Sequence, residues 1–263
     1  MSLAISVKET RKKDNTVVFL IKDSTPAFVN ALRRTVMGKV PVMAVDEVAF
    51  VQNSSGLFDE VIAHRLGLLP LTTDLKNYVR KDECTCEGAG CARCTVKLSL
   101  KVKGPGYVYA EDIKSKDPAV KPAYPKTPIT KLLKGQEVEF EATAILGVGN
   151  DHVKWSPAHV WHTNEPKLTI NAKHPDLKQW IQKYPPHVFK DGKVDKDAIE
   201  EHNLYDAVDG VNDDIIKVEY EKNNFLFHVE PFGQLKAKEI MLATIEYLKL
   251  QFEILETSAK ALE

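Results

Sequence analysis

The sequence predicts an α+β fold on three observations. Short apolar runs separated by polar turns indicate strands at the start of the chain and throughout residues 45–172. One sharply bounded helix follows the first strands, and a long amphipathic helix ends the sequence. With 263 residues, of which 43% are hydrophobic and 28% charged, the composition is that of an average soluble globular protein. The chain is long enough for one large domain or two smaller ones.

The first elements are predicted to be two strands and a helix. Residues 3–8 and 16–21 are strand-like and are joined by a polar turn. In the next segment Thr25 is placed to cap a helix, and Pro26 suits the first helical position. Gly38 is typical of a helix end, so we expect this helix to stop there.

The middle of the chain is predicted to be rich in strands, and the segment after it differs in character. Residues 173–217 are polar, acidic and poor in aliphatic side chains, which favours a small accessory segment. Two further strands, 215–220 and 224–231, are predicted to form a hairpin that turns at 221–224. The strand-like runs of the middle part are 45–52, 95–102, 106–110 and 137–146.

A long helix is predicted from about Lys236 to Leu262, roughly 40 Å in length at about 1.5 Å per residue. Its apolar residues form a near-heptad stripe with a second apolar flank beside it. One small domain could hardly cover both, so we expect a second chain to pack there. A helix that lies wholly on its own sheet is the alternative. The stripe contains Met241, Ile245, Leu248, Phe252, Leu255, Ala259 and Leu262, and the flank contains Ile240, Tyr247, Leu250 and Ile254.

All four cysteines, Cys84, Cys86, Cys91 and Cys94, lie within one eleven-residue stretch in the pattern C-x-C-x4-C-x2-C. In a reducing compartment, thiolates at this spacing more often hold a metal than form disulfides. Four sulfurs complete the tetrahedral shell of Zn²⁺ and leave no open position, so the pattern favours one structural zinc over a catalytic one. An iron–sulfur centre, two disulfides or idle thiols are the alternatives.

Charge and the N-terminal sequence limit the function classes. The formal net charge is −1, whereas a chain that grips nucleic acid by itself usually has a basic surplus. We therefore expect only indirect contact with nucleic acid. The N-terminal residues contain no apolar run long enough for a signal peptide or a membrane span, which predicts a soluble, cytoplasmic protein.

No catalytic motif stands out in the sequence. His152, His159 and His162 lie close together, but the acidic ligand and helical setting of a zinc protease motif are missing. Phosphate-binding glycine loops and serine-hydrolase motifs are absent from the sequence. We interpret the chain as non-catalytic. A zinc-ribbon-containing nucleic-acid-binding module and a zinc enzyme are the rival interpretations.

Two blocks of sequence together resemble a known family. Residues 28–48, "FVNALRRTVMGKVPVMAVDEV", followed by 57–71, "LFDEVIAHRLGLLPL", resemble the alpha-type assembly subunit of cellular RNA polymerases. The similarity is greatest to the archaeal D-type subunit and its eukaryotic third-subunit counterpart. It extends over nearly the whole chain except 173–217. The family implies a non-catalytic assembly platform of DNA-directed RNA polymerase, so the chain would belong to a nucleotidyltransferase only as part of that complex.

The resemblance also implies a domain organisation. Residues 1–44 and 215–263 would form a discontinuous dimerisation domain, a sheet with two packing helices. Residues 45–172 would form an inserted, mostly β domain with the zinc loop. Residues 173–214 would stand where many archaeal relatives carry a ferredoxin-like domain with an iron–sulfur cluster. This stretch contains no cysteine, so no cluster is expected there.

The family further implies partners and contact residues. An L-type subunit would form a heterodimer with this chain, the large catalytic subunits would dock on it, and small N- and P-type subunits would complete the platform. Docking of the large subunits is assigned to Arg33, Arg34, His64 and Arg65. The partner interface is assigned to Phe28, Asn30, Leu32, Arg33, Arg34, Val36, Met241, Ile245, Leu248, Phe252 and Leu255.

Overall fold

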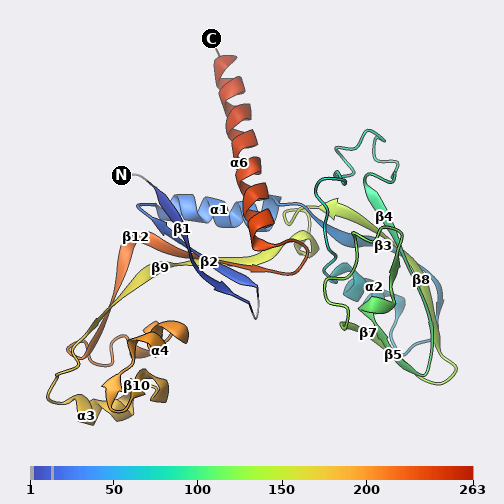
Figure 1. Cartoon of the computed structure of the whole chain (residues 1–263). Helices are drawn as coiled ribbons and strands as arrows, with labels where there is room; N and C mark the ends of the chain where they lie inside the picture. Colours follow the sequence, from blue (N-terminus) through green and yellow to red (C-terminus); the bar gives the residue numbers. More distant parts are fainter. Residues whose placement is uncertain (1–2, 13–14, 263) are drawn as a thin grey trace. The chain divides into compact units, whose positions relative to one another are not determined.

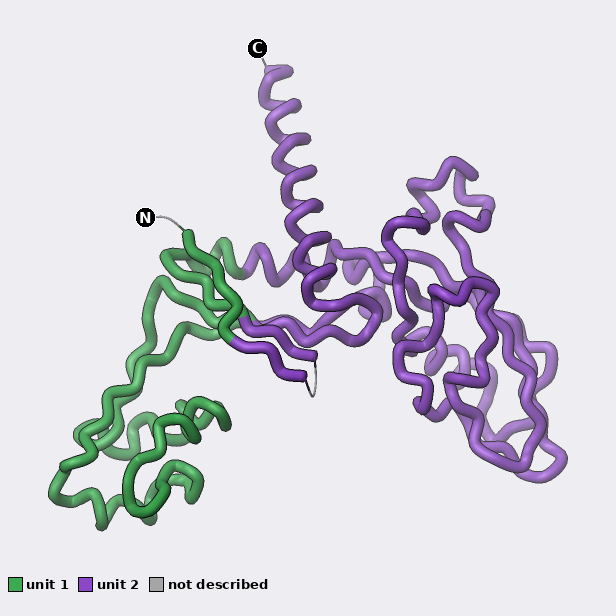
Figure 2. The backbone as a smooth tube through the Cα atoms, in the orientation of Figure 1, with its two compact units in different colours: residues 1–8, 19–29, 162–227 green, residues 9–18, 30–161, 228–263 purple. Residues whose placement is uncertain are grey.

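The computed structural model describes residues 3–12 and 15–262. The chain divides into two compact units (Figure 2). Unit 1 contains residues 1–8, 19–29 and 162–227, and unit 2 contains residues 9–18, 30–161 and 228–263. Strands, one medium helix and one long helix make up most of the regular structure, as an α+β fold requires (Figure 1).

The bounds of the elements follow the chain in order. The strands are β1 Ala4–Arg11, β2 Thr16–Lys22, β3 Val42–Asn53, β4 Thr95–Lys103, β5 Gly106–Tyr109, β6 Lys114–Ser115, β7 Pro128–Leu132, β8 Glu137–Gly147, β9 Ala158–Ile170, β10 Phe189–Lys190, β11 Lys193–Val194 and β12 Ile216–Pro231. The α-helices are α1 Pro26–Lys39, α2 Asp59–Gly67, α3 Leu177–Trp180, α4 Lys196–Glu201, α5 Tyr205–Val208 and α6 Ala237–Lys260.

The two ends of the sequence meet in one sheet. Its strand order is β1-β2-β12-β9, so residues from the first and the last quarter of the chain are hydrogen-bonded neighbours. Helix α1 follows β2 and begins as predicted, because the Thr25 hydroxyl accepts a hydrogen bond from the Phe28 backbone N–H at 3.3 Å. Pro26 is its first residue, and it ends at Lys39, one residue beyond the predicted stop.

The predicted hairpin at residues 221–224 is wrong. Strand β12 runs unbroken for 16 residues from Ile216 to Pro231. Its neighbours explain why the polar middle does not turn. The Asn164 side chain donates to the Glu221 carbonyl at 2.8 Å, and the Ser24 backbone N–H donates to the Asn223 carbonyl at 2.9 Å. Backbone groups that a turn would have paired locally are satisfied by the adjacent segments instead.

The β-rich middle of the chain is built on a second sheet, with the order β3-β8-β4-β6, and a small β5-β7 pair. Strand β4 alternates as its sequence predicts: Val96, Leu98 and Leu100 are buried, and Lys97 and Ser99 between them are exposed. The buried side chains join Phe140 of β8 and Ile62 of α2 in one hydrophobic cluster. Truncation of a buried aromatic such as Phe140 costs about 3–5 kcal/mol in comparable cores.

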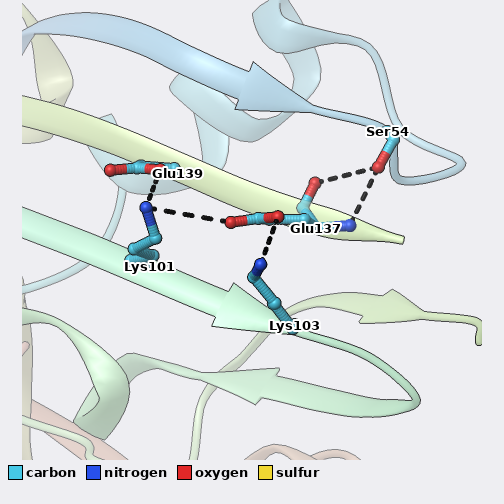
Figure 3. A network of polar contacts seen from close by, with 5 residues as sticks. All are labelled: Ser54, Lys101, Lys103, Glu137 and Glu139. Carbon is cyan, nitrogen blue, oxygen red and sulfur yellow. Dashed lines mark hydrogen bonds and ion pairs between the residues drawn. The ribbon is translucent and has the colours of Figure 1, made fainter. Parts of the chain in front are cut away.

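The outer face of this sheet carries cross-strand ion pairs (Figure 3). Lys101 Nζ lies 2.6 Å from Glu139 Oε2, and Lys103 Nζ lies 3.3 Å from Glu137 Oε2. The Ser54 hydroxyl accepts a hydrogen bond from the Glu137 backbone N–H at 2.8 Å and donates to its carbonyl at 3.2 Å. The hydrogen bond to Glu139 raises the pKa of Lys101. Lysines and glutamates therefore neutralise one another along this face.

The accessory segment has a small core of its own. Tyr184, Val188 and Ile199 are buried in a cluster that also includes Ile215 and Val218. Short helices, including α3, α4 and α5, and the two-stranded β10-β11 sheet enclose this cluster. The predicted domain boundaries at residues 44, 172 and 214 do not coincide with the limits of the two compact units, and that division stays a prediction.

None of the helices within residues 3–12 and 15–262 is both long and apolar enough to cross a lipid bilayer. The longest of them, α6, has 24 residues and carries charged side chains along its length.

Gly149, which follows β8, packs against the backbone near the end of α1 and provides a test of that contact. A Cβ atom on Gly149 would lie 1.9 Å from the Met37 carbonyl oxygen, which is backbone and cannot rotate away. We expect Gly149→Ala to lower the free energy of unfolding by about 2 kcal/mol or more. Gly56→Ala is the control, because nothing lies within 4 Å of its Cβ position. Equal denaturant midpoints for the two variants would contradict the close approach.

Candidate functional site

The four cysteines lie on two tight turns just before strand β4. The Glu87 backbone N–H donates to the Cys84 carbonyl at 3.0 Å, and the Cys94 backbone N–H donates to the Cys91 carbonyl at 3.0 Å. Gly90 has φ +87°, a left-handed conformation that lacks steric cost only for glycine. The chain therefore reverses twice in eleven residues and returns the second pair of sulfurs to the first.

The geometry of the sulfurs fits one tetrahedral metal ion. All four Sγ atoms lie within 4.8 Å of one another. Cys84 Sγ and Cys91 Sγ are 3.6 Å apart, as are Cys86 Sγ and Cys94 Sγ. A tetrahedron with metal–sulfur bonds of about 2.3 Å has sulfur–sulfur edges of about 3.8 Å, whereas a disulfide would bring two sulfurs to about 2.05 Å. The donor set and its spacing are therefore compatible with zinc.

The four thiols differ in their burial and in their hydrogen bonds, and the pKa values of Cys86 and Cys94 differ accordingly. Cys84 and Cys94 are buried, and Cys86 and Cys91 are half-buried. The hydrogen bond from the Cys84 thiol, followed by that from the Gly90 backbone, lowers the pKa of Cys86 to about 6. Burial raises the pKa of the Cys94 thiol to about 12. A bound metal ion would hold both as thiolates, because coordination deprotonates a thiol.

A tyrosine anchors the segment that leads into the cysteine turns. Tyr78 is buried, and its hydroxyl donates a hydrogen bond to the Asp117 carboxylate. The Val79 backbone N–H donates to the Arg93 carbonyl at 3.0 Å, which closes the base of the loop. Burial and the bond to Asp117 together raise the pKa of Tyr78 to about 12.

The histidines singled out in the sequence do not form a comparable site. Within the described residues, the four cysteines are the one group of three or more potential ligands whose donor atoms come close enough for a metal. His152 accepts a hydrogen bond from the Lys154 backbone N–H at 3.0 Å and lies edge-on to Trp155. His159 lies beside the Trp161 ring at a centroid distance of 5.0 Å. They serve as ordinary packing and turn residues.

Helix α6 leaves most of its apolar stripe uncovered. Only Ala237, Ile240 and Thr244 are buried, all in its first two turns. Every residue from Lys249 to Leu262 is exposed, and the alternative of a helix that lies wholly on its own sheet is therefore wrong. The exposed apolar residues are Leu242, Ile245, Leu250, Phe252, Ile254, Leu255 and Leu262.

The predicted partner residues of helix α1 fall into two groups. Phe28 is 37% exposed, whereas Leu32 and Val36 are 5% and 0% exposed, so the chain's own residues cover them. Leu32 and Val36 are accordingly removed from the expected partner surface. Asn30 accepts hydrogen bonds from the Arg33 guanidinium at 2.9 and 3.2 Å, which fixes the direction of that side chain.

The residues assigned to large-subunit docking also differ from one another. Arg34 and His64 are exposed. Arg65 is exposed as well, but its guanidinium also donates to the Ile129 carbonyl at 2.9 Å and so ties α2 to β7. The predictions from the sequence did not include one exposed apolar surface. Leu3, Ile5 and Val7 are exposed at every second position on or next to β1, an alternation that the sequence itself displays.

The comparison with known proteins first identifies the class to which this chain belongs. Residues 39–160 match the family model described as "RNA polymerase Rpb3/RpoA insert domain", which covers the β-rich part with the cysteine turns. The relatives named "DNA-directed RNA polymerase subunit Rpo3" from Pyrococcus furiosus and Archaeoglobus fulgidus are each 38% identical to this chain. The alignments cover 93% and 92% of this chain, respectively, and 93% of each relative. The same-named protein of Methanosphaera stadtmanae is 34% identical, over 93% of this chain and 94% of its own length. The chain belongs to the Rpo3 family of DNA-directed RNA polymerase subunits.

The anchor at Tyr78 predicts a pH-dependent stability. The folded-state pKa of about 12 lies above the unfolded value of 10.0, so the stabilisation is complete below pH 10 and is lost as the pH rises towards 12. We expect Tyr78→Phe to lower the free energy of unfolding by about 1–2 kcal/mol near neutral pH. This difference from the unsubstituted protein should shrink above pH 10.

Denaturant unfolding across that pH range measures both effects. Tyr107→Phe is the matched control, since Tyr107 is exposed. A Tyr78→Phe effect that stays constant up to pH 12 would contradict the raised pKa.

Proposed function

We propose that this chain is a non-catalytic assembly subunit of a cytoplasmic DNA-directed RNA polymerase. Membership of the Rpo3 family over more than nine-tenths of the sequence supports this function. The observation that carries the assembly role is the long apolar face of α6, which the chain itself leaves in water. In this proposal the chain supplies surfaces and leaves nucleotide transfer to the large subunits.

The first partner in this proposal is a smaller, L-type subunit. Its contact surface would comprise Phe28 on α1 together with Met241, Ile245, Leu248, Phe252 and Leu255 on α6. Phe28, Ile245, Phe252 and Leu255 are exposed, and Met241 and Leu248 are half-buried. Because each fully buried large apolar side chain contributes about 1.5–3 kcal/mol, cover by a partner would add several kcal/mol to the stability of the helix.

The large catalytic subunits would dock through the exposed Arg34, the oriented Arg33 and the exposed His64. The exposed Arg65, whose direction is fixed by its bond to the Ile129 carbonyl, would complete this docking surface. Small subunits of the N and P types would complete the platform, and nucleic acid would be reached only through these partners.

The cysteine turns would hold one structural zinc ion. Cys84, Cys86, Cys91 and Cys94 offer four sulfurs at tetrahedral spacing, and zinc would staple a loop that has little core of its own. The domain division assigned to residues 1–44 and 215–263, 45–172 and 173–214 belongs to the same proposal.

Co-expression tests the proposed heterodimer. The chain and an L-type subunit should purify together as a soluble complex, and Phe252→Glu should reduce its yield at least about tenfold, because the new carboxylate would be buried in an apolar interface. Glu253→Lys is the control, since Glu253 is exposed on the polar face beside the stripe. A stable, monodisperse monomer that ignores the L-type subunit would overturn the assembly role.

Metal analysis tests the zinc site. The purified chain should contain about one zinc ion, and Cys86→Ser should lose it while the heterodimer still forms, because the remaining three sulfurs leave the shell incomplete. Ala92→Ser is the matched control, an exposed position between two ligands that supplies no sulfur. Unchanged zinc content in Cys86→Ser would refute the four-sulfur site.

A further inference from the structure

A cavity of about 460 Å³ lies in unit 2, away from the cysteine turns and from the apolar stripe of α6. The residues that matter for its chemistry come from four segments of the chain. They are Leu68, Tyr124, Val153, Glu230, Phe232 and Gln234. Its volume is within the range of cavities that bind small ligands or large side chains.

The rim of this cavity is apolar and partly aromatic. Val153 is 69% exposed and Tyr124 48% exposed, and Leu68 and Phe232 are exposed as well. Four large apolar side chains that gather around one hollow form a surface suited to contact with another molecule. The two aromatic rings provide flat faces against which a planar group can stack.

The cavity contains a carboxylate that no basic side chain of the described residues neutralises. Glu230 is half-buried, and no lysine, arginine or histidine in the described part of the chain lies within 4.0 Å of its carboxylate. Gln234 is 6% exposed. Its Nε2 donates to the Ser156 carbonyl at 3.3 Å, but its Oε1 accepts no hydrogen bond from any described residue. This oxygen has almost no accessible surface, so the Glu230 carboxylate is the acceptor that an entering group can reach.

The lysine at the cavity does not neutralise this carboxylate. Lys154 Nζ lies 2.9 Å from Asp46 Oδ1 and 4.2 Å from the centre of the Trp155 ring, so its charge is already engaged. The cavity therefore combines an unpaired carboxylate with an apolar, partly aromatic rim. That combination suits a cation with a flat apolar face.

We propose that this cavity binds an arginine side chain of another subunit of the polymerase. A guanidinium group is planar, stacks on aromatic rings and can donate two parallel hydrogen bonds to the Glu230 carboxylate. A lysine ammonium has no flat face and is more strongly hydrated, so it fits these walls less well. The inference rests on the proposed function, because the donor is a subunit of the assembled enzyme.

Cross-linking within the assembled polymerase identifies the occupant. A photoreactive benzoylphenylalanine in place of Tyr124 should cross-link to a peptide of another subunit that contains an arginine within a few residues of the attachment point. The same group in place of Tyr107, an exposed tyrosine on β5, is the control. A cross-linked peptide without arginine, or no cross-link to any subunit, would overturn the inference.

Substitution of the carboxylate measures its contribution. Glu230→Gln should increase the dissociation rate of the cross-linked subunit about tenfold or more, because its arginine loses a charged partner. The exposed Glu201→Gln should leave that rate unchanged. Glu230→Arg combined with arginine-to-glutamate exchange in the partner should restore binding. Failure of the charge exchange together with an unchanged rate in Glu230→Gln would refute the arginine site.

The two proposals fail separately. If the chain joins no other polymerase subunit, the proposed function is wrong. If it assembles normally but the cavity gives neither the cross-link nor the effect of Glu230→Gln, only the arginine site is wrong.

Discussion

The apolar face of α6 is the constraint on which the other features of this protein depend. Most helical stability in proteins comes from the tertiary packing of an amphipathic face. Here packing within the chain reaches Ala237, Ile240 and Thr244 and then stops. Residues 249–262 expose large side chains to solvent, an arrangement that costs free energy until another surface covers it. Cover of this face by another subunit would therefore stabilise the folded helix.

The cysteine turns also need stabilisation beyond packing within the chain, and a bound metal ion would provide it. Four sulfurs at tetrahedral spacing sit on two short turns, and no residue from 79 to 94 belongs to the hydrophobic cluster that includes Tyr78 and Val96. Tyr78 and the Val79–Arg93 hydrogen bond close the base of the loop, and a metal ion would fix its tip. A structural metal ion of this kind fixes the conformation of a short loop without a larger hydrophobic core. It would present a rigid surface beside the sheet that β4 enters.

The sequence predicted the elements whose signals are local. The cap at Thr25 and the proline after it define the start of α1, and the heptad stripe defines α6. Contacts between segments far apart in the sequence determine the features that the sequence did not predict. Strand β12 continues through a polar, turn-like tetrapeptide because neighbouring segments bond its backbone. Periodicity also marks an apolar face without saying what covers it, so Leu32 and Val36 could not be told from Phe28. Likewise, no local pattern joins Arg65 to Ile129 or Glu230 to Tyr124.

The distribution of charge favours association through apolar and specific polar contacts over direct binding of nucleic acid. Lys101 and Lys103 of β4 lie opposite Glu139 and Glu137 of β8 and form ion pairs with them (Figure 3). To bind phosphates, these lysines would first have to leave carboxylates that already neutralise them. A net charge of −1 adds no long-range attraction for nucleic acid. A zinc-ribbon module that binds nucleic acid directly would need the opposite arrangement, with basic side chains left unpaired on one face. The half-buried Glu230 carboxylate, which no basic side chain of the described residues contacts, attracts a cationic protein side chain and repels a phosphate.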